Sequence, residues 1–326
     1  MNSKAFEERY ARTGPSWQIA PDVAFLPLPI VNVYMVGAPD TGPWALIDAG
    51  LPGTAGKILD AAAERFGPDA RPEAIIMTHG HFDHVGALRT LAERWNVPVY
   101  AHPLELPYLT GRSDYPPADP TVGGGAMARL SFLYPHGPID LGGRVLPLPE
   151  DGSVPGMPGW RWLHTPGHSP GHVSLFRDSD RTLIAGDAFV TTKQESAIAA
   201  LTKSQEMRGP PMYFTPDWRA SHHSVTTLAA LQPAVAATGH GIPMWGDQLQ
   251  TELEKLARDF DRVAVPEHGR YVPEPAVMDT HGVVSLPPAT SSPLPIALGI
   301  AAAVLTVGIV AVIRRRSNGM ESRHGE

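Results

Sequence analysis

Short apolar runs rich in Val, Ile and Leu recur between residues 31 and 237, separated by polar stretches that contain glycine and proline. Runs of this length, bounded by turn-forming residues, are typical of short buried strands. The pattern predicts strands at residues 31–36, 44–47, 74–77, 97–101, 160–163, 173–176, 182–185 and 234–237.

Apolar residues with helical spacing lie between several of these runs. This spacing predicts helices at residues 54–66, 85–95, 221–231 and 248–261. Strands that alternate with helices favour an α/β arrangement of packed layers over an all-β barrel.

The C-terminal region has a different pattern. Residues 294–313 form a stretch of 20 residues without a charge, followed directly by three arginines. About 20 apolar residues are enough to cross a bilayer as a helix, so the pattern predicts a single C-terminal transmembrane anchor, with a buried helix as the alternative. The expected organisation is a catalytic domain at 1–272, a Pro/Ser-rich linker at 273–293, the anchor at 294–313 and a basic tail at 314–326.

The orientation of this expected anchor stays open. The arginines after residue 313 would be cytoplasmic under the positive-inside rule, which would place the catalytic domain on the other side. The N-terminus, however, has no apolar core of a secretory signal, which favours a catalytic domain on the cytoplasmic side of the membrane.

Composition narrows the chemistry. The chain has 326 residues, of which 43% are hydrophobic and 18% charged, as expected for an ordered globular protein. Its formal net charge of -7 weighs against nucleic acid as a partner, because phosphate-binding surfaces need clustered Lys and Arg. Because it has no cysteine and 14 histidines, any transition-metal site must use His, Asp or Glu.

The most informative segment is AIIMTHGHFDHVGAL at residues 74–88, in which four ionisable side chains follow an apolar strand. They are His79, His81, Asp83 and His84. Four such groups within six positions would be costly to bury without partners, whereas imidazole and carboxylate together suit zinc, iron or manganese. The segment therefore predicts a metal site in the loop after the strand.

The sequence THGHFDHVG resembles the HxHxDH signature of the metallo-β-lactamase superfamily, whose fold is a four-layer αββα sandwich. Further motifs follow in the superfamily's order: TPGHSPGH with His168, LIAGD with Asp187 and ATGHG with His240, while ALIDAG upstream places Asp48. The resemblance implies a first metal bound by His79, His81 and His168, and a second bound by Asp83, His84 and His240. Asp187 would bridge both, and Asp48 would orient a ligating histidine.

The same resemblance implies a dinuclear hydrolase that cleaves a lactone, ester or thioester bond of a small molecule with a metal-bound hydroxide. Asp83 would orient the hydroxide and receive a proton. We expect two divalent ions, Zn²⁺ first, with Mn²⁺ and Fe²⁺ as alternatives.

Two other functions compete with hydrolysis. A persulfide dioxygenase with one iron would use part of the same ligand set on the same fold, and a membrane-tethered binding module would need no catalysis. The sequence leaves open the natural substrate, the oligomeric state and the roles of His172, His164 and Tyr213.

Overall fold

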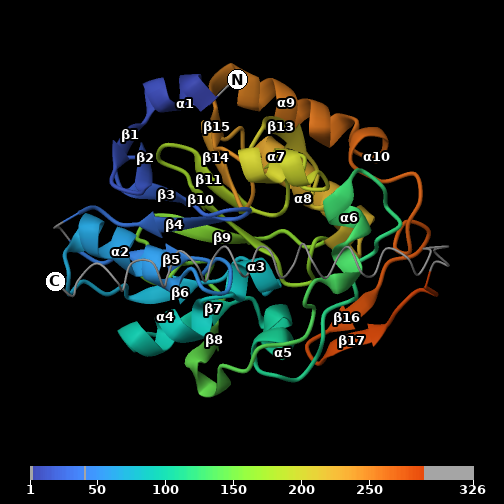
Figure 1. Cartoon of the computed structure of the whole chain (residues 1–326), viewed down its shortest axis with the longest axis horizontal. Helices are drawn as coiled ribbons and strands as arrows, with labels where there is room; N and C mark the ends of the chain where they lie inside the picture. The colour runs from blue at the N-terminus through green and yellow to red at the C-terminus, as the bar shows by residue number, and fades with distance from the viewer. Residues whose placement is uncertain (1–2, 40–41, 290–326) are drawn as a thin grey trace, which may run out of the picture. The chain divides into compact units, whose positions relative to one another are not determined.

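Two β-sheets lie face to face, and helices cover the outer face of each sheet (Figure 1). The computed structural model describes residues 3–39 and 42–289, and the compact unit to which they belong ends at Pro288. The predicted αββα sandwich is confirmed in this part of the chain.

The first sheet has eight strands in chain order, antiparallel from β1 to β5 and parallel from β5 to β8. They are β1 (Ala11–Thr13), β2 (Ser16–Ala20), β3 (Val23–Pro27), β4 (Asn32–Val36), β5 (Ala45–Ile47), β6 (Ala74–Ile76), β7 (Val99–Ala101) and β8 (Val145–Pro147).

The second sheet has the order β15-β14-β11-β10-β9, and β11 and β14 run parallel. Its strands are β9 (Trp160–His164), β10 (Val173–Arg177), β11 (Thr182–Gly186), β14 (Val235–Thr238) and β15 (Met244–Trp245). Two smaller sheets are the pairs β12 (Val190–Thr192) with β13 (Gln205–Arg208), and β16 (Val277–Asp279) with β17 (Gly282–Ser285).

The helices that cover the first sheet are α2 (Ala55–Phe66) and α4 (Leu88–Trp95), with the short α3 (Phe82–Val85) before α4. Those that cover the second are α8 (Trp218–Ala230) and α9 (Gly246–Arg258). Shorter helices complete the described chain: α1 (Ser3–Arg9), α5 (Leu106–Leu109), α6 (Ala126–Arg129), α7 (Ala197–Thr202), α10 (Phe260–Val263), and the 3₁₀ turns η1 (Pro103–Glu105), η2 (Ser131–Leu133), η3 (Gly142–Arg144) and η4 (Met212–Phe214).

Strands buried on both faces explain why the apolar runs are nearly continuous. In β5, Leu46 packs under the helices, while Ala45 and Ile47 pack between the sheets. On α4, Leu88, Leu91, Ala92 and Trp95 recur at helical spacing and face the first sheet. All eight predicted strands and all four predicted helices are present with shifts of a few residues at their ends.

The prediction of a transmembrane helix, and with it that of a membrane partner and a membrane location, is corrected. Within residues 3–39 and 42–289 no helix is long and apolar enough to cross a membrane. The longest, α8 and α9, have 13 residues each, which is about 20 Å against a hydrocarbon core of about 30 Å. The predicted segment 294–313 lies outside the described residues, where the expectation rested on composition alone.

The β16–β17 hairpin lies where a Pro/Ser-rich linker was expected at 273–293. It contacts the body of the protein through the backbone N–H of Val283, which donates to Ser113 Oγ, and directly before the hairpin the N–H of Ala276 donates to the carbonyl of Pro216. The division into a domain at 1–272 and a following linker stays a prediction.

Candidate metal centre

The ends of several strands meet at one edge of the sandwich. β5 and β6 are parallel, as are β11 and β14, so their carboxyl ends lie together in each sheet. Backbone hydrogen bonds join the sheets at this edge, from the N–H of Val173 to the carbonyl of Thr78 at 2.9 Å and from that of Asn32 to the carbonyl of Gly239 at 2.8 Å. The loops after these strands therefore converge on one place.

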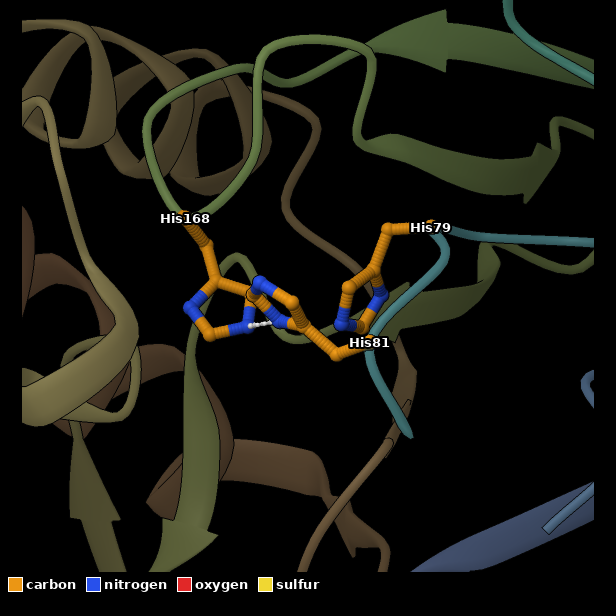
Figure 2. Close-up of side chains that lie close together, drawn as sticks. All are labelled: His79, His81 and His168. Carbon is orange, nitrogen blue, oxygen red and sulfur yellow. Dashed lines mark hydrogen bonds between the residues drawn. The ribbon is translucent and has the colours of Figure 1, made fainter. Parts of the chain in front are cut away.

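Three histidines from two of these loops form the first ligand group. His79 and His81 follow β6, and His168 lies in the loop between β9 and β10 (Figure 2). One potential ligand atom of each lies within 4.8 Å of the others, and all three side chains are buried. His81 Nδ1 and His168 Nε2 are 2.9 Å apart.

A second group, with its potential ligand atoms also within 4.8 Å of one another, consists of Asp83, His84 and His240. A third group shares one residue with each of the other two and consists of His79, His84 and Asp187. Asp187 directly follows β11. Its Oδ2 lies 2.9 Å from His240 Nε2, 3.5 Å from His168 Nε2 and 3.6 Å from His84 Nε2. Asp187 is thus the residue at which the two groups meet, and all seven predicted site residues lie together.

Hydrogen-bond acceptors next to the cluster fix the ring orientations of His84 and His240. Asp48, directly after β5, has a left-handed backbone with φ 61 and accepts from His84 Nδ1 at 2.7 Å. The carbonyl of Ile30 accepts from His240 Nδ1 at 2.5 Å. Because each Nδ1 donates outwards, the Nε2 atom of both histidines is directed towards the cluster and would bind a metal there in the deprotonated form.

Burial lowers the pKa of three of the five histidines in the cluster. Burial, with His84 adding to it, lowers the pKa of His81 to about 3, and burial lowers the pKa values of His79 and His168 well below the usual range. These three imidazoles are neutral at pH 7, which is the form that binds metals.

The pKa values of three residues of the cluster, Asp187, His84 and His240, shift in the opposite sense to that expected from burial. Although burial opposes all three shifts, His240 and His84 hold the pKa of Asp187 well below its usual range. Asp187 and Asp48 raise the pKa of His84, and Asp187 raises that of His240. The carboxylates thus attract positive charge to the place where the two groups meet.

Unpartnered atoms in the cluster test whether a metal fits. Among the described residues, His79 Nε2, His84 Nε2 and Asp187 Oδ1 are buried and have no hydrogen-bond partner. Buried polar atoms without a partner are uncommon in native proteins. Divalent cations accept the lone pairs of such imidazole and carboxylate atoms, so the residues present fit a metal centre.

Gly239 shows how closely the chain is packed around this centre. A Cβ at this position would lie 2.0 Å from Asp187 Oδ1 and 2.9 Å from His84 Cε1. Any larger residue would therefore displace Asp187 or His84, so the glycine before His240 is required by the site itself.

His172, whose role the sequence left open, is hydrogen-bonded to the backbone of Asp187. Its Nε2 accepts from the backbone N–H of Asp187 at 2.9 Å, and its Nδ1 contacts Thr165 Oγ1 at 2.8 Å. His164 lies outside the ligand groups, where it stacks on His102 with ring centroids 4.1 Å apart.

Sequence reasoning missed Glu105, a fully buried residue whose side chain contacts both loops of the first group. A signal was present, because this acid stands alone in the apolar sequence PLELPYL. Isolated acids in apolar surroundings are almost never fully buried unless they have partners.

A narrow pocket opens beside the first group. It is too tight to admit a water molecule, and apart from His81 and His168 it is lined by Tyr115, Pro116, Pro117, Phe214, Pro216 and Tyr271. Phe214 stacks on His81 with centroids 4.6 Å apart, while Tyr213 is buried next to it. The wall of the pocket is thus largely apolar and aromatic.

Comparison with known proteins agrees with this geometry. Residues 26–240 match the family model described as the metallo-beta-lactamase superfamily. "Probable metallo-hydrolase YflN" of Bacillus subtilis (strain 168) is 49% identical over 253 residues, which cover 77% of this chain and 96% of that protein. "Hydroxyacylglutathione hydrolase" of Bradyrhizobium sp. is 29% identical over 154 residues, 47% of this chain and 46% of that protein. Among solved structures, the BLEG-1 B3 metallo-beta-lactamase has a TM-score of 0.51 at 26% identity, covering 71% of this chain and 98% of its own.

Proposed function

This chain belongs to the metallo-β-lactamase superfamily and is a metal-dependent hydrolase, and we propose that it hydrolyses a lactone, ester or thioester with two divalent cations. In this proposal His79, His81 and His168 would hold the first cation, and Asp83, His84 and His240 would hold the second. Asp187 would contribute a ligand to both.

One observation carries the proposal. Asp187 stands between two complete ligand groups, with Oδ2 within 3.6 Å of imidazole nitrogens from both and with Oδ1 unpartnered among the described residues. A carboxylate with one oxygen free and the other shared in this way suits a bridging ligand better than a structural ion pair. The intact second group also favours two ions over a single iron, and therefore hydrolysis over persulfide oxygenation.

Two bound divalent cations would supply a nucleophilic hydroxide at neutral pH and Lewis acidity towards a carbonyl oxygen. The donor set of imidazoles and carboxylates without thiolate suits Zn²⁺, with Mn²⁺ and Fe²⁺ as alternatives.

The chain's own residues would do the remaining work. Asp83, whose Oδ2 is 3.6 Å from His240 Nε2, would orient the attacking water and accept its proton at a carboxylate oxygen. Phe214 and Tyr271 would exclude bulk water from the first group, because their rings line the pocket beside it. His172 would keep Asp187 in place through the backbone N–H that it accepts.

The reactants are proposed from the pocket and from one relative. An apolar, aromatic wall favours an uncharged acyl group next to His81 and His168. The Bradyrhizobium relative is named for the hydrolysis of hydroxyacylglutathione, which is a thioester. Thioesters therefore stand beside lactones and esters as the first substrates to test.

The test combines elemental analysis of the purified full-length chain with a hydrolysis screen of lactones, esters and thioesters. We expect about two zinc or manganese ions per chain and turnover of at least one class. One iron per chain, with oxygen uptake on a persulfide and no hydrolysis, would replace the proposal by the dioxygenase. Absence of stable metal would overturn the metal centre itself.

A further inference from the structure

Glu105 is a fully buried carboxylate at the end of η1, and its four hydrogen-bond partners are all neutral donors. Its Oε2 accepts from the backbone N–H of Gly80 at 3.0 Å and from the hydroxyl of Tyr115. Its Oε1 accepts from Ser169 Oγ at 2.7 Å and from the N–H of Gly171 at 2.8 Å. The two oxygens thus contact two different segments of the chain.

These segments are the loops that carry the first ligand group. Gly80 lies between His79 and His81, while Ser169 directly follows His168 in the sequence. One carboxylate therefore joins the two loops from which all three histidines of the group project. Tyr115 strengthens the connection, because its hydroxyl also accepts from the N–H of Gly80 at 2.8 Å.

Two glycines of the ligand loops pack closely against Glu105 and against its partner Tyr115. A Cβ on Gly171 would lie 2.8 Å from Glu105 Cγ, and one on Gly80 would lie 2.6 Å from the hydroxyl oxygen of Tyr115. Both loops therefore carry glycine where they approach Glu105 or its partner. The second ligand group has other supports, since Asp48 bonds His84 and the Ile30 carbonyl bonds His240.

We propose that Glu105 is a positioning residue for the first metal: by holding the Gly80 and Ser169–Gly171 backbones together, it sets the spacing between His79, His81 and His168. The inference rests on the proposed metal centre, and it predicts an effect on only one of the two metal sites. Loss of Glu105 weakens the first site and leaves the second nearly intact.

The first test is Glu105→Gln, which keeps the shape of the side chain. In glutamine one of the two carboxylate oxygens is replaced by an NH₂ group, which donates and cannot accept. The two donors that face this NH₂ group therefore lose their acceptor, and one of the two loops loses its hydrogen bond to the side chain. Outer partners of metal ligands typically contribute about 10- to 100-fold to metal affinity, and we expect a loss of this size at one of the two sites. The measurement is zinc affinity by competition with a chromophoric chelator.

A matched control is Asp119→Asn. Asp119 is also buried and accepts from the hydroxyl of Thr121 and the backbone N–H of Arg270, but it contacts neither ligand loop. Both variants exchange a buried carboxylate for an amide, so a general loss of stability would affect both. We expect the control to bind two zinc ions with wild-type affinity.

Cobalt substitution adds a readout that a merely structural role would not change. Co²⁺ at the first site should show an altered ligand-field spectrum in Glu105→Gln, while the spectrum of the second site stays as in the wild type. Thermal unfolding of the metal-free proteins, compared with Asp119→Asn, separates an effect on the site from an effect on the fold.

Ser169→Ala and Tyr115→Phe decide the question if Glu105→Gln does not fold. Each removes one donor from one side of the carboxylate, and each should weaken the first site by a smaller factor. A wild-type protein with two ions and folded variants that all keep both affinities would overturn the inference on Glu105 alone. A wild-type protein without metal would overturn the proposed function instead.

Discussion

The two ligand groups are held in place differently. The histidines of the first group project from two loops that Glu105 joins through its neutral donors, close to the backbone bond from Val173 to Thr78. In the second group, Asp83 and His84 lie on α3, and His84 and His240 each have an acceptor of their own. The first site thus depends on the spacing of two loops, whereas the second depends on the direction of individual imidazoles, so changes around the centre should act on one site at a time.

Asp187→Ala should have the largest effect, because it removes the residue that the two groups share. We expect the loss of both metals and a fall in activity of more than about 100-fold, beyond the range found for outer partners. Elemental analysis and turnover on the best substrate measure this effect. Asp178→Ala, which changes an exposed carboxylate paired with Arg161, is the control and should retain both ions. Two ions in Asp187→Ala would contradict the bridging role.

His81→Ala and His240→Ala sharpen the comparison, because each removes a ligand from one group only. We expect His81→Ala to lose most of the first metal and His240→Ala most of the second, each with about one ion left per chain. Activity should fall strongly in both, since the proposed reaction uses both ions. Equal loss of both metals in each variant would mean that the sites do not fill separately.

Asp48→Asn is the counterpart of Glu105→Gln and should act on the second site. Asp48 bonds His84 directly and reaches His79 through Thr78, from whose backbone N–H and hydroxyl it accepts. We therefore expect a loss of about 10- to 100-fold in affinity that falls mainly on the second metal. Competition with a chelator and the Co²⁺ spectrum distinguish the sites. If Asp48→Asn and Glu105→Gln weaken the same site, the contrast between the two groups is wrong.

Tyr271→Ala should have the smallest effect, limited to substrate choice. The Tyr271 ring lines the pocket, and its hydroxyl donates to the carbonyl of Pro117 at 2.7 Å. Removing the ring should raise kcat/KM for a larger acyl group, relative to a smaller one, by about 10-fold. One methylene group in an apolar pocket changes this ratio by about 10-fold or more. Metal content should not change. Tyr271→Phe keeps the ring and should keep the wild-type preference, so an equal shift in both variants would exclude a steric role.

The sequence predicted those parts of the site whose residues are close together in the chain or lie in recognisable motifs. His79 to His84 fall within six positions after one strand, so their chemistry could be read locally. Asp187 and His240 are far apart in sequence, and were identified by the resemblance of LIAGD and ATGHG rather than by their spacing. The structure then brought all seven together.

Glu105 could not be found in this way, because its partners are spread along the chain. Gly80 is 25 residues away, and Ser169 and Gly171 are 64 and 66 residues away. Such contacts depend on the packed sheets and leave only an isolated acid in the sequence. Strands β1 to β3, β8, β12, β13, β15 and the β16–β17 hairpin were also missed, since strands are stabilised by packing against their neighbours more than by local propensity.

Anomalous diffraction from crystals of the full-length chain at the zinc absorption edge tests the two-metal centre most directly. Two peaks are expected, one surrounded by His79, His81 and His168 and one by Asp83, His84 and His240, with the Asp187 carboxylate between them. A single peak in crystals grown with excess zinc, or two peaks away from these residues, would contradict the dinuclear site.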